Sequence, residues 1–208
     1  MQACKGEDMK EYTKNILIVG VGGQGVILAS NILSEVAMTG GFDVKKNEAH
    51  GQSQRSGSVS SHIRFGKKVY SPMIGQAEAD LVVAFEELEA LRWANYLKPG
   101  GTVVVNRQRI YPPSVTSGID QYPEDAVSIL RKEKMEVVDV DGMAIANRLG
   151  NPLLVSTILL GAMSNFLPFS EKLWKTAIRQ LVPEKHRDLN LTAFEEGRKL
   201  AGGKKERM

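Results

Sequence analysis

The stretch Asn15-Ile-Leu-Ile-Val-Gly-Val-Gly-Gly-Gln-Gly-Val26 decides the fold class of this chain. Its apolar residues 16–19 are typical of a buried parallel strand. Gly20, Gly22 and Gly25 follow with the spacing G-x-G-x-x-G, which permits a tight turn, close approach of the backbone to a ligand and close packing of the next helix. The stretch therefore predicts a Rossmann-like first strand, turn and helix.

The same Gly-rich turn is a candidate ligand site. Free N–H groups and a partial positive charge at the start of the following helix favour an anion such as phosphate. Val26 stands where a Walker A loop requires Lys, so a P-loop is excluded. Two hypotheses remain open at this point: a bound nucleotide or CoA-type ligand, and a purely structural corner between strand and helix.

The composition indicates one α/β domain and excludes several function classes. The 208 residues suffice for one large hydrophobic core. The numbers of basic and acidic residues, 27 and 24, are nearly equal, so the charge does not indicate binding to nucleic acid. The single cysteine, Cys4, excludes an intramolecular disulfide and cannot supply the four thiolates of a conventional iron–sulfur cluster. With no signal-peptide pattern and no apolar stretch of about 20 residues, we expect a cytoplasmic protein without a membrane or nucleic-acid partner.

Strand and helix patterns alternate along the chain, which predicts a single three-layer α/β domain with a mixed, mostly parallel sheet and helices on both faces. A turn at residues 66–68 predicts a hairpin whose return strand, 69–74, makes the sheet mixed. The expected strands are 16–19, 42–48, 59–65, 80–85, 102–106 and 136–140, and the expected helices are 26–38, 87–97, 123–132, 143–149, 153–166, 170–181 and 189–200. The predicted domain covers residues 15–200, between a loose N-terminal extension over 1–14 and a frayed tail over 201–208.

A second candidate ligand segment is the loop Ala49-His-Gly-Gln-Ser-Gln-Arg-Ser-Gly57. It follows a predicted strand, and loops beyond the carboxyl ends of strands border the ligand crevice of an open α/β sheet. Arg55 has the fork geometry that pairs with phosphate or carboxylate, and neighbouring Ser, Gln and Gly groups complete a cradle. We expect this loop to face the Gly-rich turn. The alternative is a solvated loop with a surface arginine.

Acidic and histidine residues are candidates for other chemistries. Glu48 lies near the position where dinucleotide folds carry an acid that binds a ribose hydroxyl, and Asp43 is a weaker candidate. Two interpretations stay open: either acid binds the ribose of NAD, or both are ordinary charged residues at the end of a strand. The histidines, His50, His62 and His186, lack the spacing of metal ligands. No G-x-S-x-G nucleophile elbow occurs. The sequence therefore predicts neither a metal site nor catalytic residues.

Six segments taken together are similar to one known family. They are Ile-Val-Gly-Val-Gly-Gly-Gln-Gly at 18–25, Glu-Ala-His-Gly-Gln-Ser-Gln-Arg-Ser-Gly at 48–57, Ser-Ser-His-Ile-Arg at 60–64, Tyr-Ser-Pro at 70–72, Ala-Asp-Leu-Val-Val-Ala-Phe-Glu at 79–86 and Leu-Lys-Pro-Gly-Gly at 97–101. In this order they resemble the gamma-type subunit or domain of 2-oxoacid:ferredoxin oxidoreductases, most closely the small subunits of the indolepyruvate type. The likeness extends over about residues 14–200.

The resemblance implies one subunit of a complex that oxidatively decarboxylates a 2-oxoacid, transfers the acyl group to CoA and passes electrons to ferredoxin. It implies a hetero-oligomer in which a large alpha subunit holds thiamine diphosphate, Mg and the iron–sulfur clusters, in agreement with the cysteine count. This chain would hold no cofactor alone and would be inactive alone. The competing hypotheses are a free-standing Rossmann-like oxidoreductase that binds NAD or a flavin, and a structural or regulatory subunit whose Gly-rich turn is empty.

The resemblance also implies a crevice on this chain by which CoA or substrate approaches the partner. Relatives usually carry two glycines after the arginine of the second loop, whereas here Ser56 comes first, and its Cβ narrows the backbone freedom of the loop. The residues expected to border the crevice are Gly20, Gly22, Gly23, Gln24, Gly25, Gln54, Arg55 and Gly57.

Overall fold

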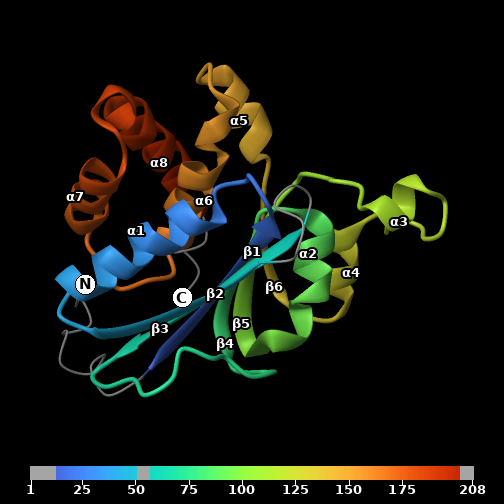
Figure 1. The fold of residues 1–208 in the computed structure, drawn as a ribbon, viewed down its shortest axis with the longest axis horizontal. Coiled ribbons are helices and arrows are strands. Elements are labelled where there is room, and N and C mark those ends of the chain that lie inside the picture. The colour runs from blue at the N-terminus through green and yellow to red at the C-terminus, as the bar shows by residue number, and fades with distance from the viewer. Residues whose placement is uncertain (1–12, 51–56, 202–208) are drawn as a thin grey trace.

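One mixed sheet with the strand order β2-β3-β1-β4-β5-β6 forms the centre of the computed structural model, which describes residues 13–50 and 57–201 (Figure 1). The neighbouring pairs β1–β4, β4–β5 and β5–β6 are parallel, and β3 is antiparallel to both β1 and β2. The predicted mixed, mostly parallel sheet is confirmed. The strands are β1 Lys14–Val21, β2 Asp43–His50, β3 Ser58–Gly66, β4 Ala79–Ala84, β5 Leu97–Asn106 and β6 Glu136–Val140.

The antiparallel part of the sheet is not the predicted hairpin. Both edges of β3 are occupied, by β1 and by β2, so residues 69–74 have no strand edge to pair with. They cross the sheet as an irregular segment instead. Arg64 Nη1 donates to the carbonyl of Met73 at 3.0 Å, and the N–H of Ile74 donates to Nδ1 of His62 at 3.2 Å. The predicted return strand was wrong because β2, the preceding strand, and β1, which lies far earlier in the chain, take both edges of β3.

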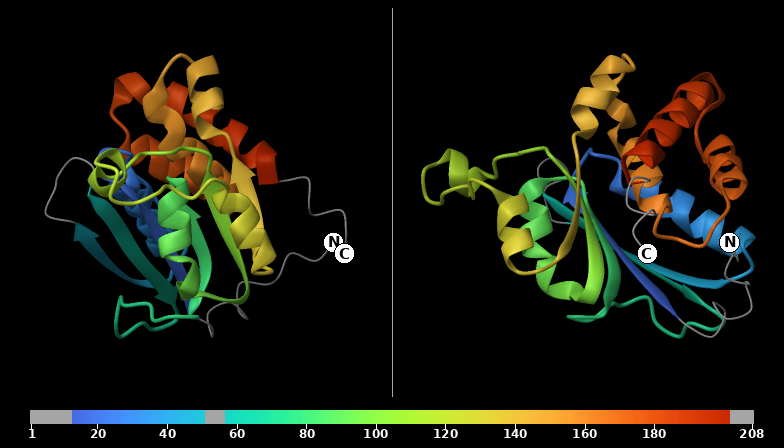
Figure 2. Two further views of the ribbon diagram at one scale, coloured as in Figure 1. Left: turned by 90° about the vertical axis from the view of Figure 1, so that its right-hand side faces the viewer. Right: turned by 180° about the vertical axis from the view of Figure 1, so that it is seen from behind.

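Helices cover both faces of the sheet (Figures 1 and 2). Ile16 and Ile18 of β1 point into one core and Leu17 and Val19 into the other, as the alternation of a strand requires. This confirms the predicted three-layer α/β fold. The first core packs against α1 Val26–Thr39, α5 Gly142–Arg148, α6 Val155–Ser164, α7 Glu171–Leu181 and α8 Arg187–Ala201, and the second against α2 Glu87–Arg92 and α4 Ala126–Lys132.

Helix α6 is the central helix of the larger layer. All of its residues are buried, and it lies within this domain against the sheet and α8. Two glycines allow the backbones of α6 and α8 to pack closely against each other. A Cβ at Gly161 would lie 2.1 Å from the carbonyl oxygen of Phe194, and one at Gly197 would lie 1.9 Å from that of Ile158. The crossing therefore requires glycine on both helices.

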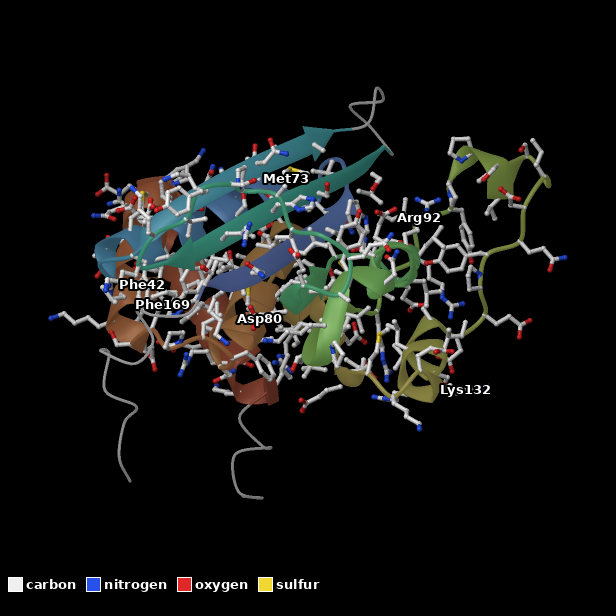
Figure 3. All side chains as sticks on the ribbon, turned by 90° about the horizontal axis from the view of Figure 1, so that it is seen from below. Phe42, Met73, Asp80, Arg92, Lys132 and Phe169 are labelled. Atoms are coloured by element: carbon white, nitrogen blue, oxygen red, sulfur yellow. The ribbon has the colours of Figure 1, made fainter. Side chains whose placement is uncertain are left out.

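An aromatic cluster closes the end of the first core that is remote from the Gly-rich turn. Phe42 precedes β2 and Phe169 precedes α7, and the two rings lie side by side with centroids 5.7 Å apart (Figure 3). Phe65 of β3 completes the cluster at 5.4 Å from Phe42 and 5.3 Å from Phe169. This contact joins segments far apart in the sequence.

Some boundaries differ from those predicted. The helix expected at 87–97 ends at Arg92 and continues as a 3-10 turn, η2 Ala94–Tyr96, because β5 begins at Leu97, opposite Ala79. The loop 111–122 contains a short helix, α3 Pro113–Thr116. Two other 3-10 turns are η3 Pro152–Leu154 and η4 Glu184–His186.

The ends of the predicted domain are described only in part. Lys14, assigned to the extension, is the first residue of β1 and is paired with Phe65. Residues 1–12 and 202–208 lie outside the described residues, as do Gln54 and Arg55. Among the helices of the described residues, none combines the length and the apolar character that crossing a bilayer requires.

Candidate functional site

The Gly-rich turn lies at the carboxyl end of β1 and leads directly into α1. Gly20 and Gly25 are required by packing: a Cβ at Gly20 would lie 2.8 Å from that of Phe85, and one at Gly25 would lie 2.9 Å from that of Ser156. Gly25 also has φ +90°, and Gly23 has φ +93°. A Cβ at Gly23 would meet nothing within 4 Å. Two of these glycines therefore serve packing, and Gly23 leaves an open approach to the backbone.

Gln24 turns its side-chain amide toward the protein. Its Oε1 accepts from the N–H of Val21 at 2.7 Å. Its Nε2 donates to the carbonyl of Phe85 and to Oε1 of Gln108, both at 3.0 Å. Both amide hydrogens are thus in use. In this structure Gln24 ties the turn after β1 to the segments that follow β4 and β5.

Asn106 continues this amide network at the end of β5. It is fully buried, and its Nδ2 donates to the carbonyl of Phe85 at 3.1 Å and to Gln108 Oε1 at 3.2 Å. Its Oδ1 accepts from the N–H of Gly142, the first residue of α5, at 3.0 Å. Gln24, Gln108 and Asn106 therefore connect the carboxyl ends of the four parallel strands. Sequence reasoning missed Asn106 and Gln108, although an amide that ends a buried apolar strand is a usable signal.

A pocket of about 370 Å³ opens beside the Gly-rich turn. Gln24 and Gln108 line it together with aliphatic side chains from α1, α5 and η3. Such a mixture of apolar walls and a few polar groups is typical of small-molecule sites. Its lining includes Gly23, Gly25, Leu28, Met143, Leu153 and Ser156.

Gly57, at the end of the second predicted ligand loop, lies against the Gly-rich turn. Its carbonyl accepts from the N–H of Gly22 at 3.0 Å. The end of the loop and the Gly-rich turn are thus in direct contact. Gln54 and Arg55, expected to face the ligand, lie outside the described residues, so their roles stay predictions.

Glu48 does not occupy the position of a ribose-binding acid. In a dinucleotide fold that acid follows the strand beside β1, but here β3 lies between β1 and β2. Glu48 Oε1 accepts from Ser30 Oγ at 3.0 Å and from Lys46 Nζ at 2.8 Å. Asp43 lies at the other end of β2, where its hydrogen bond from Lys45 lowers the pKa of its carboxyl. The topology removes the basis for NAD binding through either acid.

Three glutamates gather where β4 passes into α2, and sequence reasoning missed them. Glu86 and Glu89 are 1% exposed and Glu87 is 8% exposed. Glu86 Oε2 accepts from the N–H of Glu89 at 2.9 Å and caps α2. Glu89 accepts from Ser58 Oγ at 2.5 Å and from Arg92 at 2.6 Å. Each carboxylate is hydrogen-bonded within this chain, so the cluster supports the fold where β4 passes into α2.

The other oxygen of Glu86 holds the segment after β5. Glu86 Oε1 accepts from the N–H of Ile110 at 3.0 Å and from the hydroxyl of Tyr122. Burial is the main cause that raises the pKa of the Tyr122 hydroxyl above its usual range, and this hydrogen bond is the second. Arg109 pairs with Glu87 at 2.9 Å. Within the described ranges, 13–50 and 57–201, no group of His, Cys, Asp or Glu is placed to hold a metal ion.

The fold and site together define a class of protein: a three-layer α/β domain with an antiparallel β3 beside β1 and a Gly-rich turn beside a pocket. The pyruvate ferredoxin/flavodoxin oxidoreductase family model matches residues 15–200, and the chain belongs to this family. The resemblance found in the sequence is confirmed. The hypothesis of a free-standing NAD- or flavin-binding oxidoreductase is not favoured.

Two relatives cover nearly the whole chain. Indolepyruvate oxidoreductase subunit IorB of Thermococcus kodakarensis is 42% identical over 198 residues, which are 93% of this chain and 97% of the relative. The protein of the same name from Pyrococcus horikoshii is 42% identical over 200 residues, again 93% and 97%. The relatives are thus small subunits of oxidoreductases, similar to this chain along their full length.

Two solved structures share the fold. One is the gamma subunit of a keto/oxoacid ferredoxin oxidoreductase from Geobacter sulfurreducens, with a TM-score of 0.68 and 22% identity over 91% of this chain and 99% of that chain. The other is the 2-oxoglutarate:ferredoxin oxidoreductase from Magnetococcus marinus, with a TM-score of 0.71 and 19% identity. There the match covers 92% of this chain but 31% of that chain, so the same fold is one part of a longer polypeptide.

Proposed function

We propose that this chain is the small subunit of an indolepyruvate-type 2-oxoacid:ferredoxin oxidoreductase. The complex converts an arylpyruvate and CoA into an acyl-CoA and carbon dioxide, and ferredoxin accepts the electrons. The observation that carries this proposal is the 42% identity with two indolepyruvate oxidoreductase subunits over almost their whole length. A fold match alone would not support a substrate, because one fold hosts many functions.

The reactive cofactors of this complex belong to a large alpha subunit. Thiamine diphosphate with Mg supplies carbanion stabilisation there, and iron–sulfur clusters carry the electrons. This chain has a single cysteine, Cys4, which cannot bind a cluster of the conventional four-thiolate kind. We therefore assign no catalytic residue to this chain and expect it to be inactive alone. The hetero-oligomer and its cytoplasmic location stay predictions.

The contribution of this chain is a crevice for CoA at the carboxyl ends of its parallel strands. The start of α1 offers free N–H groups to a phosphate, and Gly23 leaves the backbone accessible. The adjoining pocket of about 370 Å³ presents Leu28 and Met143 to the apolar part of a ligand. Gln24 supports this crevice through the amide network.

The other residues proposed for the crevice are the glycines of the turn and the second loop. Gly20, Gly22 and Gly25 shape the backbone of the turn, and Gly57 holds the end of the loop against it. Gln54 and Arg55 are proposed to face the phosphate groups from that loop. This assignment is tested by Arg55→Ala in the assembled complex, which should raise the KM for CoA more than it lowers kcat.

The experiment that tests the function is anaerobic co-purification followed by an activity assay. A tagged form of this chain should recover a large, Cys-rich, thiamine-dependent subunit from its native cells. The complex should reduce ferredoxin only when indolepyruvate or another arylpyruvate and CoA are both present, and the isolated chain should show no activity. Recovery of no thiamine enzyme, or retention of a dinucleotide by the isolated chain, would contradict the proposal.

A further inference from the structure

Residues 110–122, here called the arm, project from the body of the domain between β5 and α4. Figure 1 shows α3 well apart from the other helices, and the view from behind in Figure 2 shows the same separation. None of the residues of the arm is buried. The arm therefore contributes little to the hydrophobic core.

The arm nevertheless has a defined internal structure. The N–H groups of Ile119 and Asp120 both donate to the carbonyl of Ser114, at 2.9 and 3.0 Å. Gly118, which precedes Ile119, has φ +76° and turns the chain back, and Pro113 fixes the start of α3. A projection with its own hydrogen bonds has lost much of its conformational entropy before any contact with a partner. This is typical of a preorganised recognition element.

Both ends of the arm are fastened to one buried group. Glu86, which is 1% exposed, accepts from the N–H of Ile110 at the first end and from the hydroxyl of Tyr122 at the second. The N–H of Leu88 donates to the same hydroxyl at 3.1 Å, and the ring of Tyr111 packs edge-on against that of Tyr122 at 5.2 Å. The base of the arm is thus held in the folded domain, and the tip is presented to solvent.

The tip combines an apolar side chain with a single charge. Ile119 is 79% exposed, the second-largest exposure of the large apolar side chains on the described surface after Tyr70 at 89%. Asp120 is the only charged residue of the arm, and it forms no ion pair with another described residue. An apolar group beside one unpaired carboxylate matches an apolar socket with a cation at its rim.

We propose that the arm docks this chain onto the large subunit of the same enzyme, with Ile119 in an apolar socket and Asp120 against a lysine or arginine of the partner. This proposal rests on the proposed function. In the Magnetococcus marinus enzyme the fold is 31% of one longer chain and is covalently joined to the remainder. A separate chain has only non-covalent contacts to hold its partner.

The position of the arm also favours the large subunit as its partner. Gln108 lines the pocket at the Gly-rich turn, and the arm begins two residues later at Ile110. A partner that binds the arm therefore lies beside the crevice, where a cofactor-bearing subunit must stand if CoA approaches through that crevice. A partner unrelated to the reaction has no reason to occupy this edge of the sheet.

The test compares two arm variants with a matched surface control in binding to the purified large subunit under anaerobic conditions. Ile119→Asp should weaken the Kd by about 30-fold or more, as expected for an anchor at an interface. Asp120→Lys should weaken it by about tenfold and slow association at low salt. Met38→Asp, at an apolar residue that is 53% exposed near the end of α1, should leave it within about twofold. Thermal unfolding of the isolated chain should be unchanged in all three, because each side chain is exposed.

The outcomes separate this proposal from the one on which it rests. If the unmodified chain does not bind the large subunit, the proposed function fails and the docking proposal fails with it. If the unmodified chain binds and Ile119→Asp binds equally well, the docking proposal alone is overturned. If the isolated chain is a dimer by sedimentation and Ile119→Asp makes it a monomer, the socket belongs to a second copy of this chain, and the docking proposal is again overturned.

Discussion

The hydroxyl of Tyr122 donates a hydrogen bond to the buried carboxylate of Glu86, across 36 positions of sequence. The same carboxylate oxygen accepts from the N–H of Ile110, so one atom holds both ends of the arm. Its other oxygen caps α2. The shape of an exposed segment therefore depends on a group inside the domain, and stability of the core and presentation of the arm are coupled.

Removal of the Tyr122 hydroxyl should release the arm. Tyr122→Phe leaves Glu86 with one donor fewer and the N–H of Leu88 without its acceptor. We expect the free energy of unfolding to fall by about 1–3 kcal/mol, because a buried acceptor is left short of partners. Amide exchange at Ile119 and Asp120 should become faster. Urea denaturation and hydrogen exchange measure the two effects.

Tyr111→Phe is the matched control, because Tyr111 lies in the same arm, is 53% exposed, and donates no hydrogen bond to the described residues. It should change the free energy of unfolding by less than about 0.5 kcal/mol. Equal exchange rates in the arm of Tyr122→Phe and of the unmodified chain would show that Glu86 does not hold the arm.

Gln24→Glu should loosen the Gly-rich turn. The variant keeps an oxygen for the N–H of Val21 but loses both donors, and it places a carboxylate against the carbonyl of Phe85 and Oε1 of Gln108. We expect a loss of about 1–3 kcal/mol in the free energy of unfolding. Gln76→Glu, at an exposed residue, is the control with the same change of charge. An unchanged urea midpoint for Gln24→Glu would mean that the amide network is not a structural support.

His62 should make stability depend on pH. Burial lowers the pKa of its imidazole, and Nδ1 accepts from the N–H of Ile74, which requires the neutral ring. Above a pH of about 6.5 the ring is neutral in both the folded and unfolded states. As the pH falls below that value the unfolded chain takes up a proton first, so the free energy of unfolding decreases until the folded pKa is reached.

The measurement is urea denaturation at pH 7.5, 6.5 and 5.5. His62→Asn, which retains an acceptor but does not titrate, should show a shallower decrease over this range than the unmodified chain. His186→Asn, the same substitution at an exposed position, is measured beside it as the control. Parallel curves for His62→Asn and the unmodified chain would contradict the assignment of the pH dependence to the buried ring.

Gly197→Ala should be the most damaging small substitution of this set. The added methyl group would lie 1.9 Å from the carbonyl oxygen of Ile158, so α6 and α8 must separate. We expect a loss of more than about 3 kcal/mol in the free energy of unfolding, or failure to fold. Thr192→Ala, at an exposed position of α8, should cost less than about 1 kcal/mol. A thermal midpoint for Gly197→Ala equal to that of Thr192→Ala would rule out the close crossing.

The parts of the fold that follow from local pattern were predicted from the sequence. The apolar run and glycines at 15–26 led to the first strand, turn and helix, and the apolar run at 80–85 led to β4. The place of β3 between β1 and β2 was not predictable in this way. It depends on the pairing of β3 with β1, in which Lys14 lies opposite Phe65, far away in the chain, and the turn signal at 66–68 predicted a hairpin with residues 69–74 instead.

The candidate site was predicted less completely than the fold. The Gly-rich turn is at the carboxyl edge as expected, but the orientation of the Gln24 amide depends on Phe85 and Gln108, which no periodicity relates to it. The burial of Glu86 and Asn106 was not predicted, because burial of a polar side chain is decided by tertiary contacts. Recognition of the family supplied the function, which no single motif of the chain could.

Ferredoxin reduction by the complex rebuilt from this chain and the large subunit is the most direct test of the account. The assay is run with each subunit alone and with both, and with indolepyruvate, pyruvate or 2-oxoglutarate as the acid. We predict reduction that requires both subunits and CoA, with the highest kcat/KM for indolepyruvate. Full activity of the large subunit without this chain, or no activity of the pair with any of the three acids, would contradict the account.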